Sequence, residues 1–325
     1  MMPMQGSLSI ERMCQLARVS RAGFYRLLKE TLPREEDTEV RSAIQQVALE
    51  HRRRYGYRRV TAELNRRGMQ VNHKRVARMM REDNLLAVQP KQFVTTTDSD
   101  HTYEVYLNLA RRMHLNGTDQ LWIADITYIR LQSEFVYLAV VLDAWSRKVI
   151  GWNLDRTLFS GLAVRALERA IDARQPQPGL VHHSDRGTQY ASAEYVGLLK
   201  QHGMIPSMSR PANPYDNASC ESFIKTLKRE EIYANEYASL EHLHEHIEDF
   251  IERYYNPVRL HSALGYRPPD EFEQQASQRS ETERHSATVR LFEGSLQRSS
   301  LGLEGEGTQA PSLPQTPTLL GSATE

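Results

Sequence analysis

The alternation of apolar and polar positions predicts three consecutive strands in the middle of the chain. The stretch "QLWIADITYIRL" (120–131) alternates β-branched and aromatic residues with polar ones, as a half-buried strand does. The stretch "FVYLAVVLDAWS" (135–146) is a nearly continuous apolar run, which is typical of a central strand covered on both faces. The third strand, "KVIGWNLD" (148–155), follows a short turn at 143–146.

After residue 155 the pattern alternates between two periods. Apolar residues that recur every three or four positions predict helices, and short apolar runs between turn residues predict strands. We expect helices at about 160–174, 192–202, 218–231 and 239–254, and strands at 179–185 and 204–209. Three successive strands followed by alternating helices and strands is the order of a ribonuclease H-like fold: α/β, with a mixed five-stranded sheet and flanking helices.

The N-terminal third is helical in pattern. Residues 8–30 predict two short helices, with Ser20 as the N-cap of the second. Residues 51–86 repeat this plan, with Gly68 ending one helix and Asn72 capping the next. Each pair is a candidate helix-turn-helix, and a generic helical hairpin is the alternative.

Charge separates the two halves of the chain. The 41 basic and 41 acidic residues cancel, yet residues 1–114 hold 21 Lys and Arg against 13 Asp and Glu. Residues 51–81 carry 11 basic residues and one acidic residue, Glu63. This imbalance indicates a polyanionic partner, and Tyr55 and Tyr57 among the arginines are candidates to pack on sugar or phosphate. The alternative is an exposed basic helix pair with no partner.

Other composition features exclude several classes of protein. The two cysteines, Cys14 and Cys220, lie far apart, which argues against a zinc ribbon or a disulfide framework. We find no apolar run that approaches 18 residues and no signal-peptide pattern, so we expect no membrane span and a cytoplasmic protein.

Carboxylates mark the candidate chemistry. Asp185 ends the predicted strand "GLVHHSD", where a carboxylate is costly unless it pairs with an arginine or holds a metal. Asp125 lies in a strand that we expect to be its neighbour, and Glu221 lies on the helix after "NPYDNA". Two close carboxylates raise each other's pKa, and a divalent cation removes the conflict. Three oxygen ligands suit Mg²⁺ or Mn²⁺.

Four stretches carry a family resemblance: "WIADITYI" (122–129), "HHSDRGTQY" (182–190), "SRPANPYDNASCESFIKTLKRE" (209–230) and "YYNPVRLHSALGYRPPDEF" (254–272). They resemble the insertion-sequence-three family of bacterial transposases, within the DDE transposase and integrase superfamily. The basic stretch at 52–68 resembles the helix-turn-helix that precedes that family's core.

The resemblance implies a division of the chain. We expect a helix-turn-helix-like segment at 1–40, a basic helix-turn-helix DNA-binding domain at 41–95, a linker at 96–114, the integrase catalytic core at 115–278 and a disordered tail at 279–325. The tail is rich in Ser, Thr, Gly, Pro and Gln.

It also implies a set of site residues. The family's metal ligands fall on Asp125, Asp185 and Glu221, which would hold two divalent ions. Lys228, two helical turns beyond Glu221, would contact DNA near the cut. His183 and Asn217 would support the ligands from behind. From the basic stretch we expect further DNA contacts from Arg52, Arg53, Arg54, Arg58, Arg59, Lys74, Arg75 and Arg78.

The activity implied is metal-dependent cleavage at the ends of an insertion sequence, followed by strand transfer. The partners implied are double-stranded DNA, both element ends and target, and further copies of the chain on that DNA, in the nucleoid of a bacterium. Many members also make a longer protein by frameshifting from an upstream reading frame. Because this chain begins without a long heptad region, we expect it to correspond to the downstream frame.

Three alternatives remain at this point. His242, Glu245 and His246 match an inverted zincin motif and would make the chain a zinc metallopeptidase. A second alternative is a catalytically silent DNA-binding regulator derived from a transposase. Asp143 also competes as a catalytic carboxylate, although its place beside Ser146 suits an ordinary turn former.

Overall fold

The computed structural model describes residues 9–28, 35–87, 106–110, 113–132, 134–209, 217–279 and 281–282. The chain divides into two compact units, 1–269 and 270–325. In the second unit the described residues are helical, including 279, 281 and 282 from the predicted tail. The rest of that tail and most of the predicted linker lie outside the described residues. Within the described part of the chain, no helix is long and apolar enough to cross a membrane.

The predicted mixed sheet of five strands is confirmed. The strands are β1 (Leu121–Arg130), β2 (Phe135–Asp143), β3 (Val149–Asp155), β4 (Val181–Ser184) and β5 (Ile205–Met208). Their order across the sheet is β3-β2-β1-β4-β5. The β1–β2 and β2–β3 pairs are antiparallel, whereas β1–β4 and β4–β5 are parallel. β1 therefore has an antiparallel neighbour, β2, on one side and a parallel neighbour, β4, on the other.

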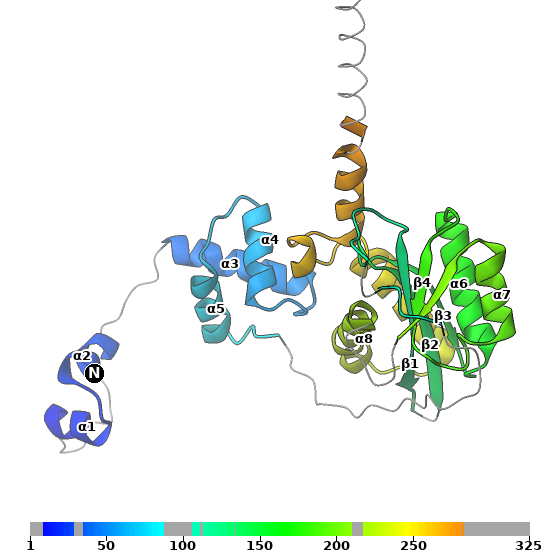
Figure 1. The fold of residues 1–325 in the computed structure, drawn as a ribbon. Coiled ribbons are helices and arrows are strands. Elements are labelled where there is room, and N and C mark those ends of the chain that lie inside the picture. Colours follow the sequence, from blue (N-terminus) through cyan, green and yellow to red (C-terminus); the bar gives the residue numbers. More distant parts are fainter. Residues whose placement is uncertain are drawn as a thin grey trace, which may run out of the picture. The chain divides into compact units, whose positions relative to one another are not determined.

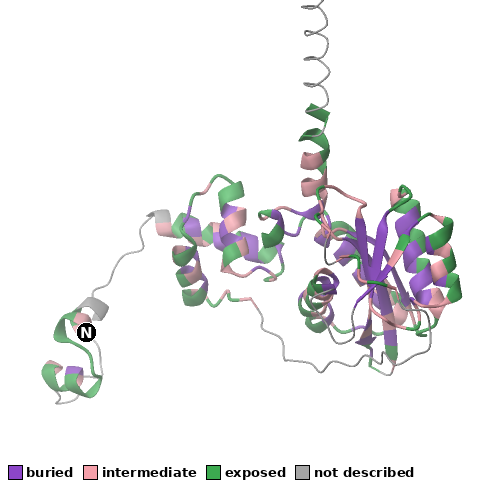
Figure 2. Cartoon of the chain, viewed as in Figure 1, coloured by how far each residue is buried: buried purple, intermediate pink, exposed green. Residues whose placement is uncertain are grey.

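Both faces of the sheet are covered, which explains the continuous apolar runs of the sequence (Figures 1 and 2). Successive residues of a strand point to opposite faces, so Ile123 packs in one apolar cluster and Trp122 in the other. The first cluster includes residues of α8 (Ala218–Glu230) and α9 (Leu240–Glu248). The second includes residues of α6 (Ser160–Arg174) and α7 (Ala193–Gln201).

Close packing of α6 on the sheet depends on Gly151 of β3. A Cβ atom at this position would lie 2.2 Å from the carbonyl oxygen of Ala166. The helix can therefore approach the strand only where the strand carries no side chain.

The N-terminal part contains α1 (Ile10–Leu16), α2 (Arg21–Leu28), α3 (Glu35–Glu50), α4 (Tyr57–Arg66) and α5 (His73–Glu82). The predicted caps are confirmed: the Ser20 hydroxyl accepts from the Gly23 N–H at 3.0 Å, and Asn72 Oδ1 accepts from the Lys74 N–H at 2.8 Å. Gly68, with a φ of 86°, follows the end of α4. An apolar cluster of α3, α4 and α5 residues forms the core of this helical part and also includes Leu260.

The last predicted helix of the core differs from expectation. Instead of one helix at 239–254, α9 passes into a π-helical segment, η4 (Asp249–Tyr255). The wider turn precedes Asn256, whose side-chain amide bonds both the N–H and the C=O of Val149, at 3.0 and 2.9 Å. These are the two bonds that a partner strand would supply at the start of β3.

Candidate active site

Two neighbouring parallel strands each lead to a carboxylate. The last printed pair of the β1–β4 ladder is Ile123 with His183. Two residues further along each strand stand Asp125 and Asp185, both half-buried. The parallel register therefore carries these two carboxylates to the same level at the point where β4 ends. Expecting β1 and β4 to be neighbours was correct.

Each aspartate is held by a local backbone bond. Asp125 Oδ1 accepts from the N–H of Ile126, and Asp185 Oδ1 accepts from the N–H of Gly187, both at 2.9 Å. The second bond spans two residues, which is the geometry of an Asx turn. A Cβ on Gly187 would lie 3.0 Å from that same oxygen, so a side chain there would press on the carboxylate.

Glu221 comes from a helix and not from the sheet: it lies in the first turn of α8. Cys220, Phe223 and Leu227 form the buried face of this helix and anchor it on the sheet. Glu221 sits one residue from that face, with 34% of its side chain exposed and Lys225 Nζ 3.2 Å away. The apolar period of α8 thus fixes where Glu221 emerges.

The charges of Asp185 and Glu221 both act on the pKa of Asp125. Burial, the charge of Asp185 and, more weakly, the charge of Glu221 raise the pKa of Asp125 to about 8. The N–H of Ile126 and the Lys228 ammonium oppose this rise only in part. At neutral pH the side chain therefore holds a proton, unless another positive charge is placed beside it.

This donor set fits a hard divalent cation. All three side chains offer oxygen ligands, and a cation would relieve the repulsion between them. Asn217 Oδ1 is also buried near β1 and lacks a hydrogen-bond partner among the described residues, while its amide donates to the Ala124 carbonyl at 3.3 Å. Across those residues, however, no three His, Cys, Asp or Glu side chains are gathered in a ready metal-binding cluster.

Lys228 lies on the same side of α8, seven residues after Glu221. Its ammonium is 4.8 Å from the centre of the Tyr128 ring. Burial lowers its pKa, and the charge of Asp125 works against that decrease, which places the two groups near each other. Sequence reasoning missed Tyr128: residues three apart on a strand point to opposite faces, so its spacing from Asp125 gives no signal.

His183 connects the two edge-side strands. Its Nδ1 lies 2.9 Å from Ser207 Oγ and its Nε2 lies 3.0 Å from Ser209 Oγ. The ring is fully buried, and Arg186 adds a bond to the Ser209 carbonyl at 2.9 Å. Both ring nitrogens are therefore engaged between β4 and the end of β5, directly behind Asp185.

The structure shows what Asp143 and the zincin-like motif contact. Asp143 is fully buried and accepts hydrogen bonds from Ser146 N–H, Ser146 Oγ and Asp119 N–H, which confirms it as a turn former. In the zincin-like motif, His246 Nδ1 lies 2.9 Å from Glu231 Oε1. One histidine of that motif is thus directed at a glutamate of the neighbouring structure.

The predicted DNA-contacting residues fall into two groups. The exposed ones are Arg52, Arg53, Arg58, Lys74 and Arg78. The others are engaged within the protein: Arg54, Arg59 and Arg75. Arg75, for example, donates to Asp37 Oδ1 at 2.6 Å. The first group is exposed, although Arg53 also donates to the Asn84 carbonyl at 2.6 Å and Arg78 lies 3.6 Å from Glu82. The second group is less exposed and more strongly engaged inside the protein.

Arg54 and Tyr55 require corrections. Only 8% of the Arg54 side chain is exposed; it donates to the Glu230 carbonyl at 3.0 Å and to Glu231 Oε2 at 2.5 Å. Tyr55 is 1% exposed, and its hydroxyl accepts from the Leu260 N–H at 2.8 Å. Neither side chain is placed to meet a sugar or a phosphate, because each is used to hold the helical part against residues 230–260.

Two glutamates at the C-terminal end of α8, Glu230 and Glu231, take part in this contact. We call Glu230, Glu231, Arg54, Arg59, Arg259 and His246 the Glu230–Glu231 joint. Arg259 holds Glu230 by two bonds, 2.8 and 2.7 Å, and both side chains are 2% exposed. Burial raises the pKa of Glu230, but Arg259 and Arg59 outweigh it and the pKa is lowered. Sequence reasoning missed the joint, because its partners lie as much as 177 residues apart.

Comparison with known proteins agrees with this architecture. Two family models described as integrase core domain match residues 116–214 and 202–269, and one described as HTH-like domain matches 34–93. The transposase InsF for insertion sequence IS3A of Escherichia coli (strain K12) is 36% identical over 274 residues, 83% of this chain and 95% of that protein. The insertion element IS600 uncharacterized 31 kDa protein of Shigella sonnei is 34% identical over 82% of this chain and 99% of that protein.

Among solved structures, the HTLV-2 integrase catalytic core domain in complex with magnesium matches 48% of this chain and 97% of its own length. Its sequence identity is 14% and its TM-score 0.38, a level that adds nothing to the assignment. The long match to InsF, together with the two integrase core segments, is sufficient. The chain belongs to the insertion-sequence-three family of transposases, and its core is an integrase core of the DDE type.

Proposed function

We propose that this chain cuts DNA at the ends of an insertion sequence and joins the freed ends to new DNA. One observation carries the proposal: Asp125 and Asp185 stand side by side on parallel strands, and Glu221 adds a third charge that acts on the same carboxyl. Relatives that match over most of the chain are named as transposases. The reaction is phosphoryl transfer without a covalent bond between protein and DNA.

In this proposal Asp125, Asp185 and Glu221 hold two divalent ions, Mg²⁺ or Mn²⁺. Such ions activate the attacking water or 3′-hydroxyl and neutralise charge at the phosphodiester. The protein's part is to present oxygen ligands from a rigid sheet and from the start of a helix. His183, locked between Ser207 and Ser209, keeps the end of β4 in place, and Asn217 offers an oxygen that has no hydrogen-bond partner among the described residues.

Lys228 has the position and the chemistry to bind a phosphate next to the cut. Its half-buried ammonium stands over the Tyr128 ring and near Asp125, so a phosphate beside the ions would gain a charge-assisted hydrogen bond. The distance of two helical turns from Glu221 leaves this contact outside the ligand set itself.

The helical part would recognise the element ends. Its exposed basic side chains, on α4, on α5 and in the turn before α4, suit phosphate contacts, with Lys74 and Arg78 on α5 candidates for reading bases. We further propose that several copies act together on end and target DNA in the bacterial cytoplasm, together with a longer protein from an upstream frame. The exact domain limits remain those of the sequence prediction.

The test is a nick-mapping experiment. The full chain is incubated with DNA that spans the element and its flanks, with Mn²⁺, Mg²⁺, Ca²⁺ or a chelator. We expect cuts at the element's ends with Mn²⁺ and Mg²⁺, and binding without cuts with Ca²⁺, whose bonds are longer and whose coordination is looser. Specific binding with no cut under any condition would support the silent regulator. Cutting that survives chelation would contradict the metal assignment.

A further inference from the structure

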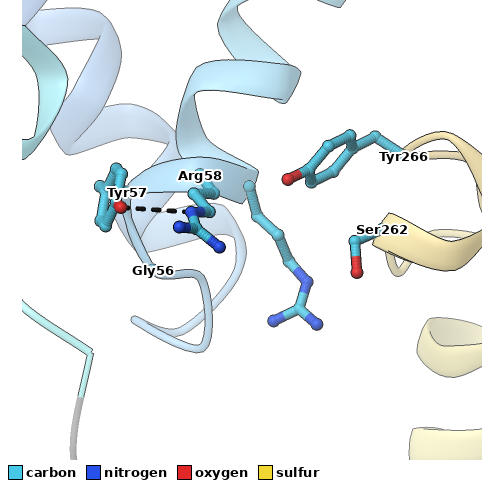
Figure 3. Close-up of a pocket in the computed structure, with 6 residues that line it drawn as sticks. Gly56, Tyr57, Arg58, Ser262 and Tyr266 are labelled. Atoms are coloured by element: carbon cyan, nitrogen blue, oxygen red, sulfur yellow. Dashed lines mark hydrogen bonds between the residues drawn. The ribbon is translucent and has the colours of Figure 1, made fainter. Parts of the chain in front are cut away.

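A cavity of about 310 Å³ lies where the helical part meets the segment that follows the core helices (Figure 3). Gly56, Tyr57, Arg58 and Arg59 line one side, and Ser262 and Tyr266 line the other. In Figure 3 the hydroxyl groups of Ser262 and Tyr266 lie across the cavity from the start of α4. None of the six lining residues is acidic, so its polar lining consists of guanidinium and hydroxyl groups.

The cavity has a surplus of positive charge. The carboxylate nearest to Arg59 is Glu230, at 3.8 Å. That carboxylate is already bonded by Arg259 at 2.7 and 2.8 Å and by Arg229 at 3.1 Å. The single negative charge of Glu230 therefore faces three guanidinium groups. Arg59 Nε donates to the Leu260 carbonyl and so makes no bond to Glu230. Burial and Arg259 lower the pKa of Arg59, while the charge of Glu230, which Arg59 shares with Arg259 and Arg229, works against that decrease.

Arg58 adds a second, more accessible cation. Its side chain is exposed, and the bond it makes inside the cavity is Nε to the Tyr57 hydroxyl at 3.2 Å. This bond fixes the direction of the guanidinium while leaving its two terminal nitrogens for a ligand. Two arginines and two hydroxyl-bearing residues that line one cavity suit a tetrahedral oxyanion.

We propose that this cavity binds one backbone phosphate of the DNA held by the helical part. A DNA phosphate is favoured over a free ion, because Arg58 is itself exposed and two further exposed arginines, Arg52 and Arg53, precede the cavity by a few residues. A phosphate here would touch α4 and the 262–266 segment at once. DNA binding would then reinforce the contact between the helical part and the residues that follow α8. The inference rests on the proposed function, since it needs a chain that binds DNA.

The test uses the full chain with a matched pair of variants. Ser262→Glu places a negative charge in the cavity at an exposed position, and Ala263→Glu places the same charge next door, exposed and outside the lining. We expect Ser262→Glu to weaken end-DNA binding at least about tenfold and Ala263→Glu less than about threefold, measured by anisotropy at fixed salt. Equal losses in the two variants would overturn the proposal.

A second measurement identifies the phosphate. Methylphosphonate substitutions remove one DNA charge at a time; we expect one position whose neutralisation weakens wild-type binding and has little further effect on Ser262→Glu. A penalty that persists in the variant at every position would overturn the proposal. So would stabilisation by inorganic phosphate that Ser262→Glu abolishes while DNA affinity is unchanged, which would mean an adventitious ion only. Nick mapping decides the proposed function separately, because it can succeed or fail whatever these variants show.

Discussion

The two ends of α8 place glutamates in opposite electrostatic situations. At its start, Glu221 joins Asp125 and Asp185, and the pKa of Asp125 is raised to about 8. At its end, Glu230 is more deeply buried than Glu221, yet the pKa of Glu230 is lowered. Burial alone would raise both values. The difference is the neighbouring charge: further carboxylates at one end, and arginines from two other parts of the chain at the other.

This contrast separates a structural cluster from a candidate catalytic one. The Glu230–Glu231 joint is complete within the protein, since Arg54, Arg59 and Arg259 supply the positive charge. The Asp125 site is incomplete, because its charges repel and one buried oxygen of Asn217 lacks a bond among the described residues. Carboxylates whose pKa is strongly raised by other carboxylates are the ones expected to act on an external ion.

The largest effect is expected when the incomplete end is altered. Asp125→Asn, Asp185→Asn or Glu221→Gln should each reduce strand cleavage by about 10³-fold or more, because each removes a charge from the proposed ion site. End-DNA binding should stay within about twofold. Cleavage and binding are measured on the same duplex. Asp172→Asn, an exposed carboxylate on α6, is the control; near-normal cleavage by any of the three variants would remove that residue from the site.

The complete end should respond in stability. Arg54→Gln leaves Glu231 buried beside fewer partners and should cost about 3 kcal/mol in the free energy of unfolding. Arg52→Gln, two residues earlier and exposed, should cost less than about 0.5 kcal/mol. Urea denaturation at neutral pH measures both. Equal stabilities would show that the joint contributes little, and Arg54 would again be a candidate for DNA contact.

The sequence predicted the catalytic half well, because its signals are local. Strand and helix periods gave the sheet and its flanking helices, and the parallel neighbours β1 and β4 followed from their order. Asp125 and Asp185 stand out because a carboxylate ends or interrupts an apolar strand. The residues next to each aspartate in the sequence are enough to identify it, so no distant contact needs to be known.

The joint was not predictable in the same way. Arg53 and Arg54 are adjacent and chemically identical, yet one is exposed and the other is buried against Glu231. The hydrogen bonds that distinguish Arg54 are with residues 176 and 177 positions away. A count of basic residues therefore overestimates the DNA-facing charge of the helical part, by at least Arg54. The turn from α9 into η4 is equally non-local, since it serves the bond between Asn256 and Val149.

A smaller effect is expected from Glu230. Glu230→Gln should cost about 1.5–3 kcal/mol at neutral pH, the usual worth of hydrogen bonds to a charged group. The pKa of Glu230 is lowered from its ordinary 4.5. Its contribution is therefore complete above that value and disappears as the pH falls through the lower pKa of the folded chain. Unfolding free energies of wild type and variant should converge toward acid pH; Glu248→Gln, an exposed glutamate, should show no such convergence.

The last effect has the opposite sign and occurs at the other end of the helix. The pKa of Asp125 rises to about 8 in the folded chain from an ordinary 3.8. Between these values the folded chain binds more protons than the unfolded one, so stability without metal should fall as the pH rises. Asp125→Asn removes this loss and should stabilise the metal-free chain by up to roughly 4–6 kcal/mol at pH 8, since the shift spans about four pKa units at about 1.4 kcal/mol each. The two proteins should be equally stable near about pH 4, and Asp172→Asn should follow the wild type throughout.

Adding Mg²⁺ should stabilise the wild type more than Asp125→Asn, because only the wild type offers the full carboxylate set. A variant that is less stable than the wild type at pH 8, or equally offset at both pH values, would show that Asp125 is already compensated, and the contrast between the two ends of α8 would be lost.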